Sequence, residues 1–168
     1  MEDIFNQPTE MVQIRDVSRQ QREIQRAAQL LKAGELVAFP TETVYGIGAL
    51  GLNVEAVERL YAAKNRPAGK AFSLQVANVN LIQQIAAYVP PMARKLLEKF
   101  APGPITVVLP KNAQVPDLVT GSRDTVGIRI PDNPVALAVL QAVGAPLAVP
   151  SANISGHVSP KSGADVFG

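Results

Sequence analysis

Two groups of small polar residues follow short apolar segments and could form the walls of a binding site. Residues 41–43, Thr-Glu-Thr, follow the apolar segment 36–39, and residues 151–153, Ser-Ala-Asn, follow the apolar segment 147–149. Ligands of open α/β sheets bind beyond the carboxyl ends of strands, so the two groups could belong to one site. Threonine, serine and asparagine are also common in ordinary turns, and that second interpretation stays open here.

A cationic loop is the second candidate. Residues 64–70 carry three cations and no acid, at a point where a predicted helix breaks. Arg66 could bind phosphate oxygens with two parallel hydrogen bonds, and Lys64 could act as a point charge. Gly69 would let the backbone approach a ligand closely. Cations are also favoured at the C-terminus of any helix, so a solvated helix end explains the same residues.

Arg129 lies within an otherwise apolar predicted strand, Val-Gly-Ile-Arg-Ile. An arginine in such a strand must reach solvent, pair with an acid or bind an anion. Asp132 is near enough in the sequence to be its structural partner. Glu42 could act as a general base on position alone, but we favour a loop carboxylate that neutralises Lys64 or Arg66.

The composition indicates one globular domain and excludes several kinds of site. Of the 168 residues, 47% are hydrophobic and 18% are charged, which suits one domain with a substantial core. There is no cysteine and a single histidine, His157, so we expect neither disulfides nor a metal site, and we assign His157 no role. A net charge of +2 and 5% aromatic residues argue against a dedicated nucleic-acid-coating protein.

The sequence shows no targeting or membrane segment. No apolar run approaches the roughly 18 residues that a membrane helix needs. The N-terminal Met1-Glu2-Asp3 is acidic and does not resemble a signal peptide. The absence of cysteine fits a reducing compartment. We therefore expect a cytoplasmic protein without a membrane segment.

Segments typical of strands alternate with segments typical of helices. Strands are predicted at residues 36–39, 71–76, 105–109, 126–130 and 147–149. Helices are predicted at residues 24–31, 53–63, 80–88, 91–100 and 134–144, and near 161. Ser18 and Gln21 have the spacing of a capping box before the first helix. The alternation predicts an α/β domain, and two strands joined without a clear helix predict a mixed sheet.

Five segments, taken together, resemble the YrdC/Sua5 family of threonylcarbamoyl-AMP synthases. Each segment is weak alone, but all of them occur in order and at suitable spacing. They are FPTETVYGIG at 39–48, KNRP at 64–67, PGPIT at 102–106, VGIRIP at 126–131 and PSANISG at 150–156. The resemblance covers roughly residues 18–167.

The resemblance implies an α/β fold with a twisted mixed sheet, flanking helices and a concave, positively charged cavity. It implies an enzyme, a nucleotidyltransferase, that converts L-threonine, bicarbonate or CO2 and ATP into threonylcarbamoyl-AMP and pyrophosphate. The product serves the t6A modification of tRNA at position 37. ATP is a substrate in this reaction, and Mg2+ would be carried mainly by the ATP phosphates.

The resemblance also implies roles for individual residues. The family's Lys-x-Arg and Ser-x-Asn signatures imply catalytic and ATP-binding roles, and they match Lys64, Arg66, Ser151 and Asn153. Further ATP contacts match Thr125 and Ser159. The threonine-binding positions match Thr41, Ser73 and Arg129. No position matches a metal ligand.

The sequence departs from the family pattern in two places. The Arg-x-Pro segment is usually followed by His-Pro, whereas this chain has Asp132-Asn133-Pro134, and we expect Asn133 to cap the following helix. Family members also continue for a few tens of residues past the position of Gly168, so we expect the C-terminal part of the domain to be incomplete. We divide the chain into an N-terminal arm at 1–17 and a YrdC-like domain at 18–168.

The expected macromolecular partners are threonylcarbamoyl-transferase proteins that pass the product to tRNA, with weak RNA binding by the chain itself. One alternative is an RNA-binding module that uses the same basic concavity. Another is a carbamoyl-adenylate-forming module without threonine specificity. The weak net charge counts against the first, and the absence of cysteine for accompanying zinc fingers counts against the second.

Overall fold

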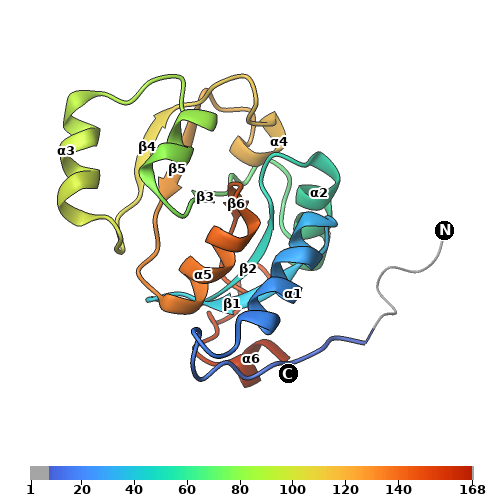
Figure 1. Cartoon of the computed structure of the whole chain (residues 1–168). Helices are drawn as coiled ribbons and strands as arrows, with labels where there is room; N and C mark the ends of the chain where they lie inside the picture. The colour runs from blue at the N-terminus through green and yellow to red at the C-terminus, as the bar shows by residue number, and fades with distance from the viewer. Residues whose placement is uncertain (1–7, 168) are drawn as a thin grey trace.

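A computed structural model describes residues 8–167, and within this range six strands form one sheet (Figure 1). The strand order is β1-β2-β6-β3-β5-β4; β3 and β5 are parallel, and the other neighbouring pairs are antiparallel. The α/β class and the mixed sheet are thereby confirmed. The strands are β1 (Val37–Pro40), β2 (Tyr45–Leu50), β3 (Leu74–Gln75), β4 (Val107–Pro110), β5 (Thr125–Arg129) and β6 (Leu147–Ala148).

Helices cover both faces of this sheet. Helices α1 and α5 lie side by side over β1 and β6 and bury one apolar cluster, which contains Phe39 and Leu147 (Figure 1). A second cluster lies on the opposite face and joins α2, η2, α3 and α4 to Leu74 and Ile128. The helices are α1 (Gln21–Lys32), α2 (Val54–Ala63), the 3-10 helix η2 (Val79–Gln84), α3 (Pro91–Phe100), α4 (Asp117–Thr120), α5 (Pro134–Val143) and α6 (Gly163–Phe167).

The register of the sheet decides which side chains share a face. Leu147 of β6 lies opposite Gln75 of β3, and Gln75 lies opposite Arg129 of β5. Side chains in register point to the same face, so this row runs from apolar Leu147 to two polar residues. Leu147 is covered by the α1–α5 layer, whereas Arg129 is half-buried and Val108 of the neighbouring β4 is 66% exposed. The helical layer therefore leaves the β5–β4 end of this face open.

Side-chain caps set the starts of two helices as the sequence predicts. The Asn53 side chain accepts a hydrogen bond from the Ala56 N–H, and the Asn133 side chain accepts bonds from the N–H groups of Val135 and Ala136. These bonds satisfy N–H groups that lack helical partners. The prediction that Asn133 keeps the capping role is confirmed, although Asn133 stands before Pro134 where the family pattern has histidine.

The capping box predicted at Ser18 is wrong. Helix α1 begins three residues later, at Gln21, and no side chain caps it. The Ser18 hydroxyl donates instead to Asp16 Oδ1 at 2.6 Å, and the Gln20 side chain accepts from the Arg15 and Asp16 N–H groups. The Ser18 hydroxyl, which was expected to cap the helix, is therefore used in a local turn before the helix begins.

The α-helix predicted at 80–88 is also wrong. The chain forms the short 3-10 helix η2 instead, which ends at Gln84. Beyond it, the Ala87 N–H donates to the Pro110 carbonyl at 2.8 Å, and Ala86 bridges to Lys111. Pairing with the end of β4 thus replaces the helical hydrogen bonds that would have continued the turn. Strand β2 and helix α4 are absent from the sequence prediction.

The N-terminal arm remains a prediction. Part of it, residues 1–7, lies outside the described residues, and residues 8–20 contain neither helix nor strand. Among the described residues, no helix has both the length and the apolar character that crossing a membrane requires.

Candidate functional site

The loop between β1 and β2 carries the first group of polar residues. Strands β1 and β2 are a hairpin whose pairing ends at Pro40 and Tyr45, so residues 41–44 form its turn. The Thr41 hydroxyl donates to the Val44 carbonyl at 2.7 Å and lies 3.1 Å from the Thr43 hydroxyl. These bonds stabilise the turn that carries Glu42.

Glu42 forms an ion pair with the Nη2 group of Arg129, and both side chains are 17% exposed. The other oxygen of Glu42, Oε2, accepts a hydrogen bond from the Asp132 N–H at 2.8 Å. Two expectations are corrected here. Glu42 neutralises Arg129, and not Lys64 or Arg66 as expected. Asp132, the expected partner of Arg129, instead donates its backbone N–H to Glu42. Sequence proximity favoured Asp132, but the hairpin turn places Glu42 over the end of β5.

Arg129 retains donors that Glu42 does not use. Its Nε atom is buried and finds no hydrogen-bond partner among residues 8–167, and Nη2 lies 3.4 Å from the Thr43 hydroxyl. Burial lowers the pKa of Arg129 from its ordinary value, although a guanidinium remains protonated at any physiological pH. The group is therefore a partly engaged cation with spare donor capacity.

A small cavity of about 90 Å³ opens beside this cation. Its walls come from the hairpin, from β3 and β5 and from the segment after β6. A methyl group on Gly46 would lie 2.5 Å from Val149 Cγ1, so only glycine permits this close approach. The lining residues are Thr41, Thr43, Val44, Gly46, Gln75, Arg129, Val149, Pro150 and Ser151.

Lys64 lies at the C-terminus of α2 and is only 3% exposed. Its ammonium group donates to the backbone carbonyls of Ser151 at 2.5 Å and Asn153 at 2.6 Å. Its own carbonyl accepts a bond from the Ser155 N–H at 2.8 Å. Lys64 therefore fixes the loop that follows β6 from two sides.

The charge of Lys64 has no acidic partner in the part of the chain that the structure describes. Burial, and then repulsion from Arg66 and Lys70, lowers the pKa of Lys64 from 10.5 to about 8. A buried cation that is held by carbonyl dipoles alone is a favourable place for an anion. The interpretation of residues 64–70 as an ordinary solvated helix end does not hold for Lys64.

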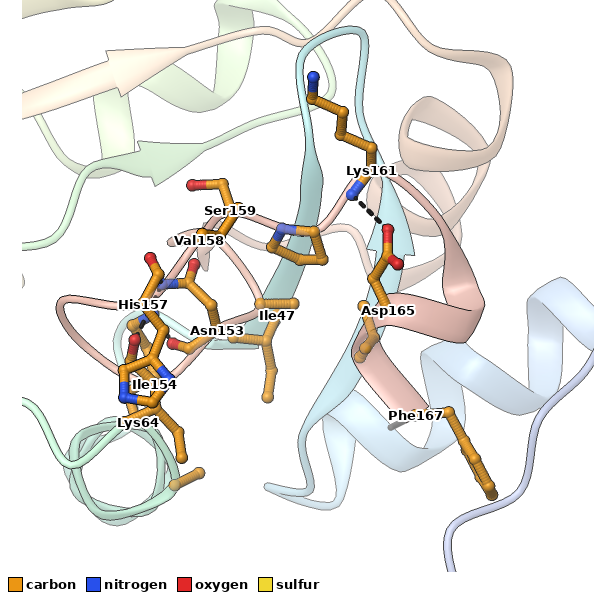
Figure 2. Close-up of a pocket in the computed structure, with 14 residues that line it drawn as sticks. Ile47, Lys64, Asn153, Ile154, His157, Val158, Ser159, Lys161, Asp165 and Phe167 are labelled. Atoms are coloured by element: carbon orange, nitrogen blue, oxygen red, sulfur yellow. Dashed lines mark hydrogen bonds between the residues drawn. The ribbon is translucent and has the colours of Figure 1, made fainter.

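A larger cavity of about 850 Å³ opens next to Lys64 (Figure 2). Figure 2 shows Asn153, His157 and Ser159 on one side of it and Asp165 and Phe167 on the other. The far wall is closed by α6, where Asp165 accepts hydrogen bonds from the N–H groups of Lys161 and Ser162. Asn153 Oδ1 is buried without a partner among the described residues.

Arg66 is engaged with its own loop. Its Nε and Nη2 groups donate to the carbonyls of Lys70 at 3.0 Å and Ala71 at 2.7 Å, and its guanidinium lies 4.5 Å from the centre of the Phe72 ring. Burial lowers its pKa, while the nearby Tyr61 opposes the change. Arg66 lines neither of the two cavities described above and gives the cationic loop its shape.

The structure brings most of the predicted site residues together, but not all of them. Thr41, Ser151 and Arg129 line the small cavity, while Lys64, Asn153 and Ser159 line the large one. Ser73 and Thr125 are exposed and line neither. Thr125 begins β5 and Arg129 ends it, so the two lie roughly 13 Å apart on the same face.

Sequence reasoning missed Gln75. It is 4% exposed and lines the small cavity one strand away from Arg129. The signal was present, because Gln75 is a polar residue inside an apolar predicted strand, as Arg129 is. Nothing in the sequence alone showed that the two share a face.

The described residues contain no group of three or more histidine, cysteine, aspartate or glutamate side chains that could hold a metal ion. The polar groups at both cavities are mostly cations, hydroxyls and amides. Such groups suit anionic and hydrogen-bonding ligands better than a metal ion bound directly by the protein.

Comparisons with known proteins agree with this geometry. The sequence model of the Sua5/YciO/YrdC family, described as "Telomere recombination", matches residues 29–167. Proteins named threonylcarbamoyl-AMP synthase are similar in sequence. The one from Pyrococcus abyssi is 45% identical over 83% of this chain, and the one from Bacillus subtilis is 42% identical over 86%.

The crystal structure of P. abyssi Sua5 complexed with L-threonine matches the fold with a TM-score of 0.86, at 44% identity over 88% of this chain. The chain spans only part of these relatives. It covers 41% of the P. abyssi sequence, 42% of the B. subtilis sequence and 43% of the chain in that crystal structure.

Proposed function

Because the chain belongs to the Sua5/YciO/YrdC family, we propose that it forms threonylcarbamoyl-AMP and pyrophosphate from L-threonine, bicarbonate or CO2 and ATP. The relatives' name indicates an enzyme of this kind, and we assign it to the nucleotidyltransferases. The product would go to threonylcarbamoyl-transferase proteins that modify tRNA in the cytoplasm, with weak tRNA contact by the chain itself.

One observation supports this proposal above the others. The segment from Ser151 to Asn153 forms a wall of both cavities, since Ser151 lines the small one and Asn153 lines the large one. The small cavity is bordered by the cation of Arg129, and the large one by the cation of Lys64. An amino acid and a nucleotide bound in the two cavities would therefore meet at this segment.

The large cavity suits the nucleotide. Its volume of about 850 Å³ lies within the range of ordinary ligand sites, and it offers Lys64 to phosphate oxygens. The Ser159 hydroxyl can donate to phosphate or ribose oxygens, and the Ser151 hydroxyl can do so from the adjoining small cavity. The Asn153 amide N–H groups already donate to the Ile154 and His157 carbonyls, so Asn153 offers its unpartnered Oδ1 as an acceptor for a ribose hydroxyl or an adenine amino group. Mg2+ would enter with ATP and be held mostly by phosphates and water. We also keep Thr125 as an expected contact of the nucleotide.

The small cavity suits the amino acid. The Nε group of Arg129 has no partner among the described residues, and its Nη2 group pairs with Glu42. Both groups can donate to the carboxylate of threonine if Glu42 moves away from Nη2 or shares it with the ligand. Thr41, in the hairpin turn, and Ser73, which directly precedes β3, would contact the rest of the amino acid.

The reaction needs no covalent enzyme intermediate. The amine of threonine adds to CO2 and loses a proton to give an N-carboxylate. An oxygen of that carboxylate attacks the α-phosphorus of ATP, and the bond to pyrophosphate breaks. Because negative charge shifts onto the leaving phosphates, Lys64 stabilises the transition state electrostatically, and Arg66 keeps the cationic loop in place.

The test is substrate dependence in a purified sample. We expect pyrophosphate release and an adenylate that carries label from bicarbonate, and both should require L-threonine. Lys64→Met should abolish both signals, while Lys32→Met at the exposed end of α1 should leave them unchanged. ATP consumption without threonine would contradict the proposal. ATP consumption driven by carbamoyl phosphate would point to the carbamoyl-adenylate alternative.

A further inference from the structure

The hydroxyl of Tyr61, near the end of α2, lies between two backbone carbonyls. It is 2.9 Å from the carbonyl of Lys70, which ends the cationic loop, and 2.9 Å from the carbonyl of Leu118 in α4. A tyrosine hydroxyl has one proton, so the two carbonyls share one donor. Burial raises the pKa of Tyr61, although Arg66 opposes the change, so the hydroxyl remains a donor at neutral pH. Tyr61 therefore joins the loop to a helix that is distant in the sequence.

Helix α4 holds the same segment at two further points. The Phe72 N–H, just after the loop, donates to the Val119 carbonyl at 2.7 Å. Gly121, which ends α4 in a left-handed conformation, packs against Gly69 of the loop. A methyl group on Gly121 would lie 2.3 Å from the Gly69 carbonyl oxygen, so only glycine permits this close approach. Helix α4 is thus the support against which the cationic loop is fixed.

The segment that Tyr61 holds also orients Arg66. The Lys70 carbonyl accepts a bond from Arg66 Nε at 3.0 Å, and the Ala71 carbonyl accepts one from Nη2 at 2.7 Å. The Phe72 ring lies 4.5 Å from the guanidinium and 4.6 Å from the ring of Tyr61. Among residues 8–167, Nη1 of Arg66 makes no hydrogen bond. The described bonds of this guanidinium therefore all go to the anchored segment, and one donor group is left for a ligand.

We propose that Tyr61 is a positioning residue of the proposed reaction, whose hydroxyl fixes the cationic loop against α4 and thereby fixes the guanidinium of Arg66 relative to the ATP phosphates. This inference rests on the proposed function and adds to it the group that holds a cation in place. Tyr61 lines neither cavity, so it acts through the loop and not by touching a ligand. Cations assist phosphoryl transfer only where they meet the developing charge, and a displacement of about 1 Å can cost about 100-fold in rate.

The experiment removes the hydroxyl alone with Tyr61→Phe and measures adenylate formation in single turnovers, in which slow rates remain measurable. The ring and its contact with Phe72 are kept. We expect the maximal rate to fall at least about tenfold, while the half-saturating threonine concentration changes less than about twofold. Tyr88→Phe is the matched control, since it removes the same group from a side chain that is 61% exposed, and it should leave the rate unchanged.

A double-mutant cycle separates positioning from general support of the fold. Arg66→Lys keeps a cation but loses the planar donors that bind the Lys70 and Ala71 carbonyls. If Tyr61 acts through Arg66, adding Tyr61→Phe to Arg66→Lys should slow the reaction less than about twofold further. A purely structural contribution would instead multiply the two losses.

A second pair of variants disturbs the loop without changing Tyr61, and it replaces Tyr61→Phe if that variant fails to fold. Gly121→Ala places a methyl group against Gly69 and should give the same loss of rate. Gly144→Ala is its control. Gly144 is also left-handed, with φ of 69° compared with 58° for Gly121, but no atom of the described residues lies within 4 Å of the added methyl group. The comparison separates displacement of the loop from backbone strain.

Three results would overturn the inference: a wild-type rate in Tyr61→Phe, multiplied losses in the cycle, or equal rates in Gly121→Ala and Gly144→Ala. Each would show that the anchored loop does not control the reacting cation. Wild-type protein that releases no pyrophosphate with ATP, bicarbonate and threonine would contradict the proposed function itself. The two failures are distinguishable, because the second is observed without any variant.

Discussion

The protonation of Lys64 makes a prediction that can be worked out from the structure. Its pKa is lowered to about 8 by burial and by the neighbouring cations. An anion bound beside it favours the charged form, so binding of ATP should raise that pKa and be accompanied by proton uptake. At pH 8 the free protein holds the proton on about half of its Lys64 side chains, and binding should take up as much as about half a proton.

The same reasoning gives the change in affinity. Between pH 7 and 9.5 the protonated fraction of a group with this pKa falls about 30-fold, so ATP affinity should fall by up to about 30-fold. Lys64→Met removes the titrating group, and its affinity should be nearly flat over this range. At pH 7 the variant should bind about 10- to 150-fold more weakly, as expected for the loss of one charge-assisted interaction.

Stability should change with pH in the opposite direction. Because the folded-state pKa lies below the unfolded one, the unfolded chain binds more protons between pH 8 and 10.5, and the free energy of unfolding rises with pH. The contribution is roughly 3 kcal/mol at most. It should appear as a difference in slope between wild type and Lys64→Met in urea denaturation.

The assay is calorimetry of ATP binding in buffers that differ in ionisation enthalpy, with wild type, Lys64→Met and the surface control Lys32→Met. The difference between wild type and Lys64→Met removes the ionisation of ATP itself. Equal pH dependence in the two proteins, without proton uptake, would refute the reasoning. Lys64 would then serve only to fix the loop from Ser151 to Asn153.

Three further predictions concern neighbouring groups. Glu42→Gln leaves Arg129 without its counter-charge, so it should lower the unfolding free energy by about 1–3 kcal/mol, and threonine should raise the melting temperature more in this variant than in wild type. Arg129→Lys should raise the threonine requirement more than tenfold with a smaller effect on ATP, because lysine cannot reproduce two parallel bonds; unchanged threonine affinity would mean that Arg129 serves Glu42 alone. Asn133→Ala should cost about 1 kcal/mol of stability in denaturant titration through the lost helix cap, with unchanged ligand binding.

Much of the fold follows from local patterns in the sequence. Helices α1, α2, α3 and α5 lie where apolar residues recur at helical spacing, and Asn53 and Asn133 cap two of them as predicted. The exceptions arose where a local or tertiary bond competed. The Ser18 hydroxyl donates to Asp16 and does not cap α1. The chain after η2 forms a hydrogen bond with the end of β4 and does not continue as a helix.

For the site, the sequence by itself determined the inventory of chemical groups. An acid-free cationic segment, an arginine in an apolar strand and hydroxyl and amide side chains after strands were each compatible with an anionic ligand, and each also had an ordinary structural explanation. The segments of family resemblance then indicated the substrates. These conclusions depend on residue types and short spacings, which a linear sequence displays directly.

Only the tertiary structure decided how those groups are paired. The hairpin turn brings Glu42 to Arg129. The segment after β6 covers Lys64 and accepts hydrogen bonds from its ammonium group through the carbonyls of Ser151 and Asn153. Register places Gln75 beside Arg129. Partner, burial and pKa depend on segments far apart in the sequence, and a one-residue shift in register would turn each side chain to the other face of the sheet.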